Sequence, residues 1–340
     1  AETMKHINIP IFIQHMGCPN QCVFCDQHAI TGAHSFCMDS VRDEIEAVLR
    51  TKGDRECEIA FFGGSFTGID RQLMLSLLDV AQEYVNAGKV RGIRMSTRPD
   101  YISPEICEIL HRYTVSQVEL GIQSFDDRVL ERCRRGHTAQ RAYEAVRLLR
   151  REGFSFVGQM MVGLPGADAR SEIETAKTIC AEGAQGTRIY PCIVFRNTPL
   201  EEMTRRGEYV PLSVEEAVSR GAAVLRVFVD AGVPVLKIGL HEGEGLHSEK
   251  TYFAGPNHPA LGELVRSRLY RDAVLAALDA RSDSARGKTL AVYVPRGAVS
   301  AVSGHKKSNK AVFEEKSGAK CVKILEKDEL CGYNVSIDIF

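Results

Sequence analysis

Residues 18–25 read Cys-Pro-Asn-Gln-Cys-Val-Phe-Cys, and they come shortly after the apolar run Ile7–Ile13. That run predicts a β-strand, in which a proline is tolerated at an edge, at a bulge or where no hydrogen bond is donated. Three thiols at spacings of four and three residues in one loop can converge on a single metal centre. Cys18, Cys22 and Cys25 are therefore candidate metal ligands.

The spacing alone leaves two kinds of metal centre open. Sulfur ligands favour either zinc or an iron–sulfur cluster. A zinc site needs a further protein ligand, for which His15, His28 and Cys37 are the candidates. The choice between the two depends on the rest of the chain.

Apolar runs and helical patterns alternate through the first two-thirds of the chain. Five further runs predict strands at Cys57–Phe62, Gly92–Ser96, Gln117–Ile122, Phe156–Val162 and Thr187–Phe195. Helical patterns separate them, at Asp39–Leu49, Asp70–Asn86, Ser103–His111, Thr138–Arg151, Ser171–Ala181 and Ser213–Asp230. Strands joined by crossover helices form a parallel sheet. Six such units predict an α/β fold, a partial (β/α)6 barrel of the TIM type.

Several strand ends carry residues suited to holding a ligand. The glycines of Gly63-Gly64-Ser65 would let the backbone approach a ligand closely, although an ordinary turn also explains them. Arg135 follows Gln123 by twelve residues, and its guanidinium group matches a carboxylate. Taken alone, Arg135 is also explained as a solvated surface charge. A parallel barrel brings such strand ends together at one face.

In their order along the chain, these motifs resemble the radical S-adenosylmethionine (radical SAM) superfamily. The resemblance rests on the cysteine loop with Phe24 before its last cysteine, the glycine segment, the strand ends at Ser96 and Gln123, and the turn at Leu164. It covers about residues 7–233. It implies that the three cysteines bind a 4Fe–4S cluster, with one iron left open for the cofactor.

The resemblance also implies a set of residues that bind S-adenosylmethionine. These are Phe24, Gly63, Gly64, Ser65, Ser96, Gln123, Arg135 and Leu164. In the family, the glycine segment holds the methionine amino group, the third strand end contacts the ribose, and the fifth strand end stacks the adenine. The glutamine lies by the cofactor and the arginine binds its carboxylate. The cofactor carries the radical chemistry, while the protein orients it and excludes water.

Within the superfamily, the sequence is most similar to the branch of the Elongator catalytic subunit and the oxygen-independent coproporphyrinogen oxidases. Gly121–Ser124 followed by Arg135–Thr138 is common to both, and residues 236–265 resemble the C-terminal extension of Elongator-like bacterial proteins. The Elongator subunit has a wider first cysteine spacing and carries an acetyltransferase domain. Its acetyl-CoA-dependent chemistry is therefore not assigned to this chain.

The last part of the chain, residues 286–340, differs from the rest in charge. It holds 10 Lys and Arg against 6 Asp and Glu, a formal charge of +4 in a chain whose total is −1. Its strand–helix–helix–strand pattern, with Gly304-His305-Lys306-Lys307 between the helices, resembles a KH domain, whose GxxG loop clamps single-stranded nucleic acid. Lys307 replaces the second glycine, which hinders close backbone approach but adds charge for phosphates. RNA binding through these four residues and a purely structural module both remain open.

Composition and motifs together predict the organisation. We expect a radical SAM barrel in residues 1–232, an Elongator-like extension in 233–280 and a KH-like module in 286–340. Eleven cysteines, no secretory signal and no long apolar stretch favour a reducing cytoplasm and speak against a membrane partner. The pattern assigns no role to Cys192, His258, Cys321 or Cys331.

The sequence therefore predicts a radical SAM enzyme that generates a 5′-deoxyadenosyl radical and modifies a base in tRNA or rRNA. Its expected partners are RNA and a reductant such as flavodoxin or ferredoxin. One alternative is a radical SAM enzyme that acts on a small molecule, a tetrapyrrole or a peptide. A second alternative is a non-catalytic iron–sulfur protein that binds RNA.

Overall fold

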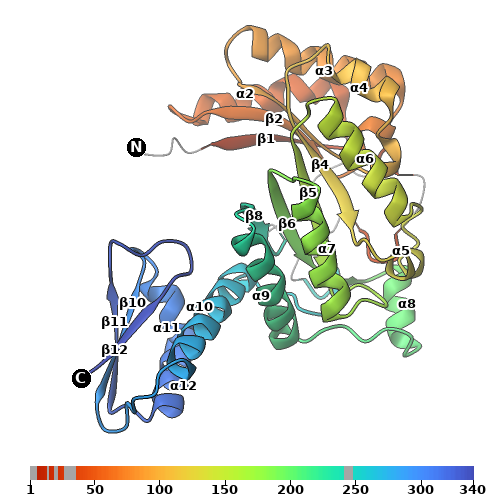
Figure 1. Ribbon diagram of the computed structural model, residues 1–340. Helices are drawn as coiled ribbons and strands as arrows, with labels where there is room; N and C mark the ends of the chain where they lie inside the picture. The colour runs from red at the N-terminus through yellow and green to blue at the C-terminus, as the bar shows by residue number, and fades with distance from the viewer. Residues whose placement is uncertain (1–5, 14, 19–21, 27–35, 241–247) are drawn as a thin grey trace.

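The computed structural model describes residues 6–13, 15–18, 22–26, 36–240 and 248–340. One sheet has the strand order β1-β2-β3-β4-β5-β6-β8 (Figure 1). Its strands are β1 Ile7–Phe12, β2 Cys57–Phe62, β3 Gly92–Thr97, β4 Val115–Gln123, β5 Phe156–Val162, β6 Gly186–Pro191 and β8 Val235–Ile238. All neighbouring pairs are parallel, so the predicted α/β fold with a partial TIM-type barrel is confirmed.

The sheet contains one strand more than the six units predicted. β8 pairs with β6 and lies in the segment expected to belong to the C-terminal extension, so the sheet continues across residue 232. The sequence predicts a single strand over Thr187–Phe195, but β6 ends at Pro191. Proline has no N–H with which to continue the ladder of hydrogen bonds. Beyond it, β7 Val194–Phe195 pairs antiparallel with β9 Tyr252–Ala254.

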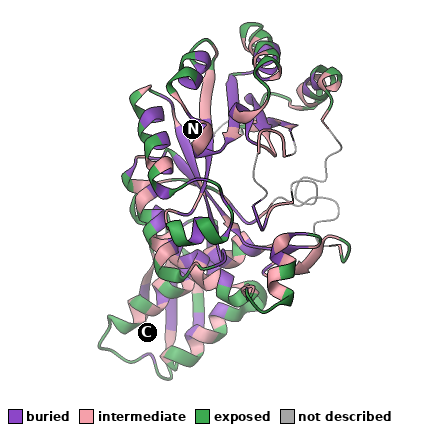
Figure 2. Ribbon diagram, turned by 90° about the vertical axis from the view of Figure 1, so that its right-hand side faces the viewer, coloured by how far each residue is buried: buried purple, intermediate pink, exposed green. Residues whose placement is uncertain are grey.

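Helices cover the outer face of the sheet. They are α2 Val41–Thr51, α3 Arg71–Asn86, α4 Pro104–Leu110, α6 Ala139–Arg151, α7 Ala169–Ala181 and α9 Val214–Asp230. The strands of this sheet are largely buried (Figure 2). Their outward-facing residues belong to the largest hydrophobic core, in which Ile59, Phe61, Ile93 and Leu120 are fully buried. Two shorter helices, α5 Asp127–Arg132 and α8 Pro199–Arg205, follow β4 and β7.

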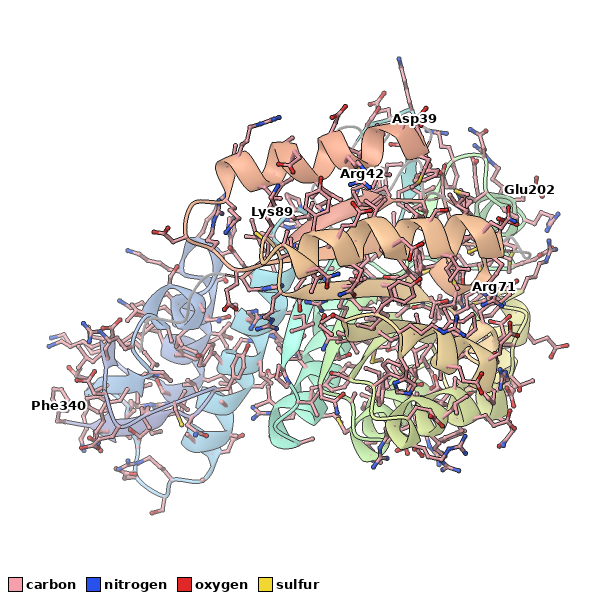
Figure 3. The ribbon with its side chains drawn as sticks, turned by 90° about the horizontal axis from the view of Figure 1, so that it is seen from above. Asp39, Arg42, Arg71, Lys89, Glu202 and Phe340 are labelled. Atoms are coloured by element: carbon pink, nitrogen blue, oxygen red, sulfur yellow. The ribbon has the colours of Figure 1, made fainter. Side chains whose placement is uncertain are left out.

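Helices α2 and α3 lie side by side over the N-terminal strands (Figure 3). Arg42 on α2 pairs with Glu83 on α3 at 2.7 Å, and Lys89 after α3 pairs with Glu46 on α2 at 2.8 Å. Such exposed pairs contribute little stability, so the apolar face beneath them holds the helices in place. Among the helices of the described ranges, none combines the length and apolar character needed to cross a bilayer.

A smaller unit follows the barrel. It consists of β10 Thr289–Val294, α11 Val299–Ser303, α12 Ser308–Ser317, β11 Cys321–Glu326 and β12 Ser336–Ile339. The predicted strand–helix–helix–strand order is present, and β10 and β11 pair in parallel. The third strand, β12, was not predicted and pairs antiparallel with β10.

The helix α10, Leu261–Asp279, connects the barrel to this C-terminal module (Figure 1). It packs against α9 on one side and against α11, α12 and β12 on the other. Tyr270 and Val274 of α10 belong to the same core as Phe313 of α12. The buried amide of Asn309 donates to the carbonyl oxygen of Ser267 at 3.0 Å and to its hydroxyl at 2.9 Å. The module is therefore fixed to α10 by both apolar packing and buried hydrogen bonds.

Candidate active site

One cavity of about 760 Å³ lies against the inner face of the sheet and reaches the carboxyl ends of the strands. Nine of the eleven residues predicted for the barrel site line it: Cys18, Cys22, Phe24, Cys25, Gly63, Gly64, Ser96, Gln123 and Arg135. The other two, Ser65 and Leu164, are buried and do not belong to its described lining.

The cysteine loop contributes all three thiols to this cavity. The Cys25 N–H donates to the Cys22 carbonyl at 3.0 Å, and the Val23 N–H donates to the Cys133 carbonyl at 3.1 Å, which ties the loop to the end of α5. All eleven cysteines are described, and none forms a disulfide. Within the described ranges, no three Cys, His, Asp or Glu side chains are grouped to hold a metal ion; His28, a candidate zinc ligand, lies outside those ranges.

Two buried guanidinium groups accompany the thiols. Arg135 donates from Nη1 to the Cys22 sulfur at 3.3 Å, while its buried Nε has no partner in the described part of the chain. Asp100 accepts two hydrogen bonds from Arg98, at 2.9 and 2.8 Å, and the buried Nη1 of Arg98 has no described partner. Burial raises the pKa of the Cys18 thiol, and the charges of Arg135 and Arg98 oppose this shift. This end of the cavity therefore favours anionic groups.

Gln123 occupies an unusual position at the end of β4. Its backbone φ is +66°, a left-handed value that few residues other than glycine adopt. The ladder between β4 and β5 shifts register between Gly121 and Gln123. The side chain lines the cavity, and its buried Oε1 accepts no hydrogen bond from any described residue. Backbone strain and an unsatisfied carbonyl in one residue indicate a position that serves a ligand.

The glycine segment after β2 is shaped by the cysteine loop. A Cβ at Gly64 would lie 2.4 Å from the Ile13 carbonyl oxygen and 2.6 Å from that of Met16, so the close backbone approach requires glycine. Ser65 is fully buried, and its Oγ accepts a hydrogen bond from the Arg98 N–H at 3.0 Å. Ser65 thus supports Arg98, and its contact with the cofactor stays a prediction.

Other singled-out residues lie beside the cavity or away from it. Leu164 is buried in an apolar cluster that includes Cys22, Val23 and Phe24 of the cysteine loop. Cys192 belongs to the same cluster, and burial raises the pKa of its thiol to about 12, as expected for a packing group. His258 accepts a hydrogen bond from the Ala260 N–H at 3.1 Å and so stabilises its own loop.

The four residues predicted to bind RNA lie in the loop between α11 and α12. His305, Lys306 and Lys307 are exposed, and the two lysines have φ values of +51° and +63°. Gly304 has φ +79°, and a Cβ there would lie 2.8 Å from the Asn309 nitrogen. None of the four belongs to the described lining of the cavity. The structure therefore separates the module loop from the barrel site.

A set of polar side chains on the inner face of the sheet was not predicted from the sequence. This inner network comprises Glu58 on β2, Arg94 on β3, Glu119 on β4, Gln159 on β5 and Arg188 on β6. Glu119 is its centre and accepts hydrogen bonds from Arg188 at 2.7 and 3.0 Å. It also accepts from Arg94 and from Gln159, each at 3.0 Å. The sequence signal that could have revealed this network is a polar residue at an inward-facing position within each apolar run.

The residues present fit an iron–sulfur cluster together with an aminocarboxylate cofactor. Three thiols, two guanidinium groups with unused N–H groups and the unpaired Gln123 carbonyl all line one cavity. Thiolates are the usual ligands of iron–sulfur clusters, in which different irons take different cysteines. A guanidinium group is the preferred partner of a carboxylate.

Comparisons with known proteins lead to the same family. The radical SAM superfamily model matches residues 13–179, and a radical SAM C-terminal domain model matches residues 184–271. The chain is 28% identical over 243 residues to the tRNA uridine(34) acetyltransferase of Methanocaldococcus jannaschii, covering 59% of this chain and 45% of that protein. It is 30% identical over 168 residues to Elongator complex protein 3 of Homo sapiens, covering 46% of this chain and 31% of that protein. The chain thus spans less than half the length of either relative.

A solved structure shows the same fold. The archaeal Elp3 of Methanocaldococcus infernus superposes with a TM-score of 0.62 at 23% identity, covering 78% of this chain and 63% of that chain. The predicted resemblance to the Elongator branch is confirmed, and the alternative of a non-catalytic protein is not supported. The chain belongs to the radical SAM superfamily, as an enzyme whose cofactors are a 4Fe–4S cluster and S-adenosylmethionine.

Proposed function

We propose that this enzyme modifies a base in RNA, either tRNA or rRNA. The observation that carries the proposal is the cavity lined by the three cysteines, Gln123 and Arg135, in which Gln123 Oε1 and Arg135 Nε have no hydrogen-bond partner among the described residues. The relatives named for tRNA uridine and for Elongator support RNA as the substrate. Because the chain spans less than half of these relatives, the proposal does not include acetyl transfer.

In this proposal Cys18, Cys22 and Cys25 hold the cluster, Arg135 holds the carboxylate of the cofactor, and Gln123 supports it. The proposed cofactor site is completed by Phe24, Gly63, Gly64, Ser65, Ser96 and Leu164. When bound, the cluster and S-adenosylmethionine supply a 5′-deoxyadenosyl radical that removes a hydrogen atom from the substrate. A reductant such as flavodoxin or ferredoxin provides the electron, and the cytoplasm is the compartment we assign.

The C-terminal module supports RNA binding through its exposed loop. His305, Lys306 and Lys307 are exposed in a module with a formal charge of +4, which favours phosphate contacts. At φ +63°, Lys307 has a left-handed backbone, which glycine adopts most readily. We therefore assign Gly304–Lys307 to contact the RNA backbone, in a KH-like manner.

Anaerobic reconstitution tests the cofactor part of the proposal. The wild-type protein should bind about four irons and four sulfides per chain and form 5′-deoxyadenosine under reductant. Cys22→Ala should lose both properties, whereas Cys180→Ala, in α7 and outside the cavity, should keep both. A wild-type protein that binds only zinc would contradict the proposal.

Nucleoside mass spectrometry tests the RNA part. A strain without the gene should lack one modified nucleoside in its tRNA or rRNA. Gel shifts with total RNA should show salt-sensitive binding that the double variant Lys306→Glu/Lys307→Glu weakens. Unchanged nucleosides and no RNA binding would instead support a small-molecule, tetrapyrrole or peptide substrate.

A further inference from the structure

The cavity contains more polar groups than the proposed cofactor site uses. Away from the thiols, its lining includes Glu119, Gln159 and Arg188, together with Asn8 of β1 and Tyr190 of β6. The register of β5 and β6 places Gln159 directly opposite Arg188. Of these residues, Glu119, Gln159 and Arg188 lie on the neighbouring strands β4, β5 and β6.

Glu119 fixes the orientation of the two side chains beside it. It accepts hydrogen bonds from Nε and Nη2 of Arg188, at 2.7 and 3.0 Å, and from the amide nitrogen of Gln159, at 3.0 Å. These bonds leave Nη1 of Arg188 and the carbonyl oxygen of Gln159 outside the contacts with Glu119, and the Arg188 guanidinium group also interacts with the hydroxyl of Tyr190. A donor and an acceptor therefore stand side by side on neighbouring strands, each on a side chain that lines the cavity.

The charges of this region balance, unlike those beside the thiols. Glu58 and Glu119 face Arg94 and Arg188, all of them buried. A buried ion pair of this kind is costly to assemble and is weak evidence of a purely stabilising role. Because its formal charges cancel, the surface favours a neutral polar ligand over a carboxylate or a phosphate.

Aromatic groups accompany the polar surface. Phe12, Phe62, Tyr190 and Phe195 line the same cavity. The guanidinium of Arg188 lies 5.9 Å from the centre of the Phe62 ring. Flat aromatic groups beside a fixed donor–acceptor pair suit a planar ligand that hydrogen-bonds along one edge.

We propose that Arg188 and Gln159, oriented by Glu119, form a recognition wall that reads the edge of a neutral planar heterocycle. The substrate class with this chemistry is a nucleobase unstacked from RNA. The inference rests on the proposed function and adds the residues that select the substrate. A tetrapyrrole or peptide carboxylate does not match the balanced charge of the wall.

The test compares two arginines that share the same carboxylate. Total RNA from a strain without the gene should stimulate 5′-deoxyadenosine formation by the reconstituted wild-type enzyme. Arg188→Met should lower this stimulation about tenfold, the cost of losing one hydrogen bond from a charged donor. Arg94→Met is the matched control, because Arg94 also donates to Glu119 but does not belong to the described cavity lining. It should keep most of the stimulation, with a loss of thermal stability similar to that of Arg188→Met.

The outcomes separate the inference from the function on which it rests. If the wild type forms no 5′-deoxyadenosine, or responds to coproporphyrinogen III but not to RNA, the proposed function fails. If RNA stimulates the wild type and both variants equally, or if both variants lose the response equally, the recognition wall alone is refuted.

A second experiment uses the wild-type enzyme, so its result does not depend on whether the variants fold. Short-wave ultraviolet crosslinking to the same RNA, followed by nuclease digestion and mass spectrometry, should yield nucleotide adducts on peptides that contain Phe62 or Tyr190. Adducts confined to the C-terminal module would show that no base enters the barrel, and they would overturn the inference.

Discussion

The two faces of the main sheet differ in their buried side chains: the outer face is apolar, and the inner face also carries a network of charged groups. Ile59 is fully buried against the helices of the outer face, while the preceding residue, Glu58, belongs to the inner network. Leu120 and Glu119 repeat this contrast on β4. Successive residues of a strand point to opposite sides, so one strand serves both purposes. The outer face secures the fold, and the inner face is where binding and chemistry are located.

The largest expected effect comes from removing the centre of the inner network. Glu119→Ala leaves the buried Arg188 without its carboxylate and leaves Arg94 with Glu58 alone, at 3.4 Å, which should lower the free energy of unfolding by about 3–5 kcal/mol. Urea unfolding of the variant and the wild type measures this difference. Adding Arg188→Met to Glu119→Ala should restore part of the loss, because one unpaired charge is removed. A cost below about 1 kcal/mol would mean that water already solvates these charges, and the contrast between the faces would not hold.

The outer face and the strand ends were predictable, and the inner network was not. Apolar runs such as that around Ile59 give strands directly, and the cysteine loop and Arg135 belong to a recognisable series of motifs. Glu119, by contrast, finds its partners 25 residues away at Arg94 and 69 residues away at Arg188. Only the register of the folded sheet brings these side chains together, so a single run of sequence does not show the pairing.

Strand β12 and the β7–β9 pair escaped prediction for a related reason. β7 has two residues and β9 has three, too few to show an alternating pattern. β12 follows a polar segment and is recognised only by its pairing with β10. Short strands depend on a partner that is distant in the sequence.

A pH profile tests a buried ionisable group near the cluster end of the cavity. Burial, aided by the charge of Arg135, lowers the pKa of His137 to about 4, from an ordinary value of 6.5. The unfolded chain therefore binds a proton more readily, and stability should fall as the pH drops from 6.5 towards 4. The loss should be on the order of 3 kcal/mol, measured by urea unfolding across this range.

His137→Gln provides the comparison for this profile, because glutamine does not titrate. The difference in unfolding free energy between the wild type and the variant should shrink or reverse as the pH falls. A difference that stays constant between pH 7 and pH 4 would show that His137 titrates normally in the folded protein.

The next effect concerns the contact between the sheet and the cysteine loop. Gly64→Ala places a methyl group 2.4 Å from the Ile13 carbonyl oxygen, so the loop must move. We expect a loss of about 1–3 kcal/mol in stability and a lower iron content after reconstitution. Gly186→Ala, where the nearest atoms lie at an ordinary 3.4 Å, should keep its iron. Equal iron contents in the two variants would indicate that the loop accommodates the added methyl group.

The smallest effect should come from a conservative change on the outer face. Ile59→Val removes one methylene group from a fully buried side chain and should cost about 0.5–1.5 kcal/mol of unfolding free energy. Because Ile59 points away from the cavity, iron content and RNA-stimulated formation of 5′-deoxyadenosine should match the wild type. A matched measurement on Glu119→Ala should show the response to RNA impaired. If Ile59→Val also changed the response to RNA, packing under the helices would control the position of the inner wall, and the two faces of the sheet could not be treated as separate layers.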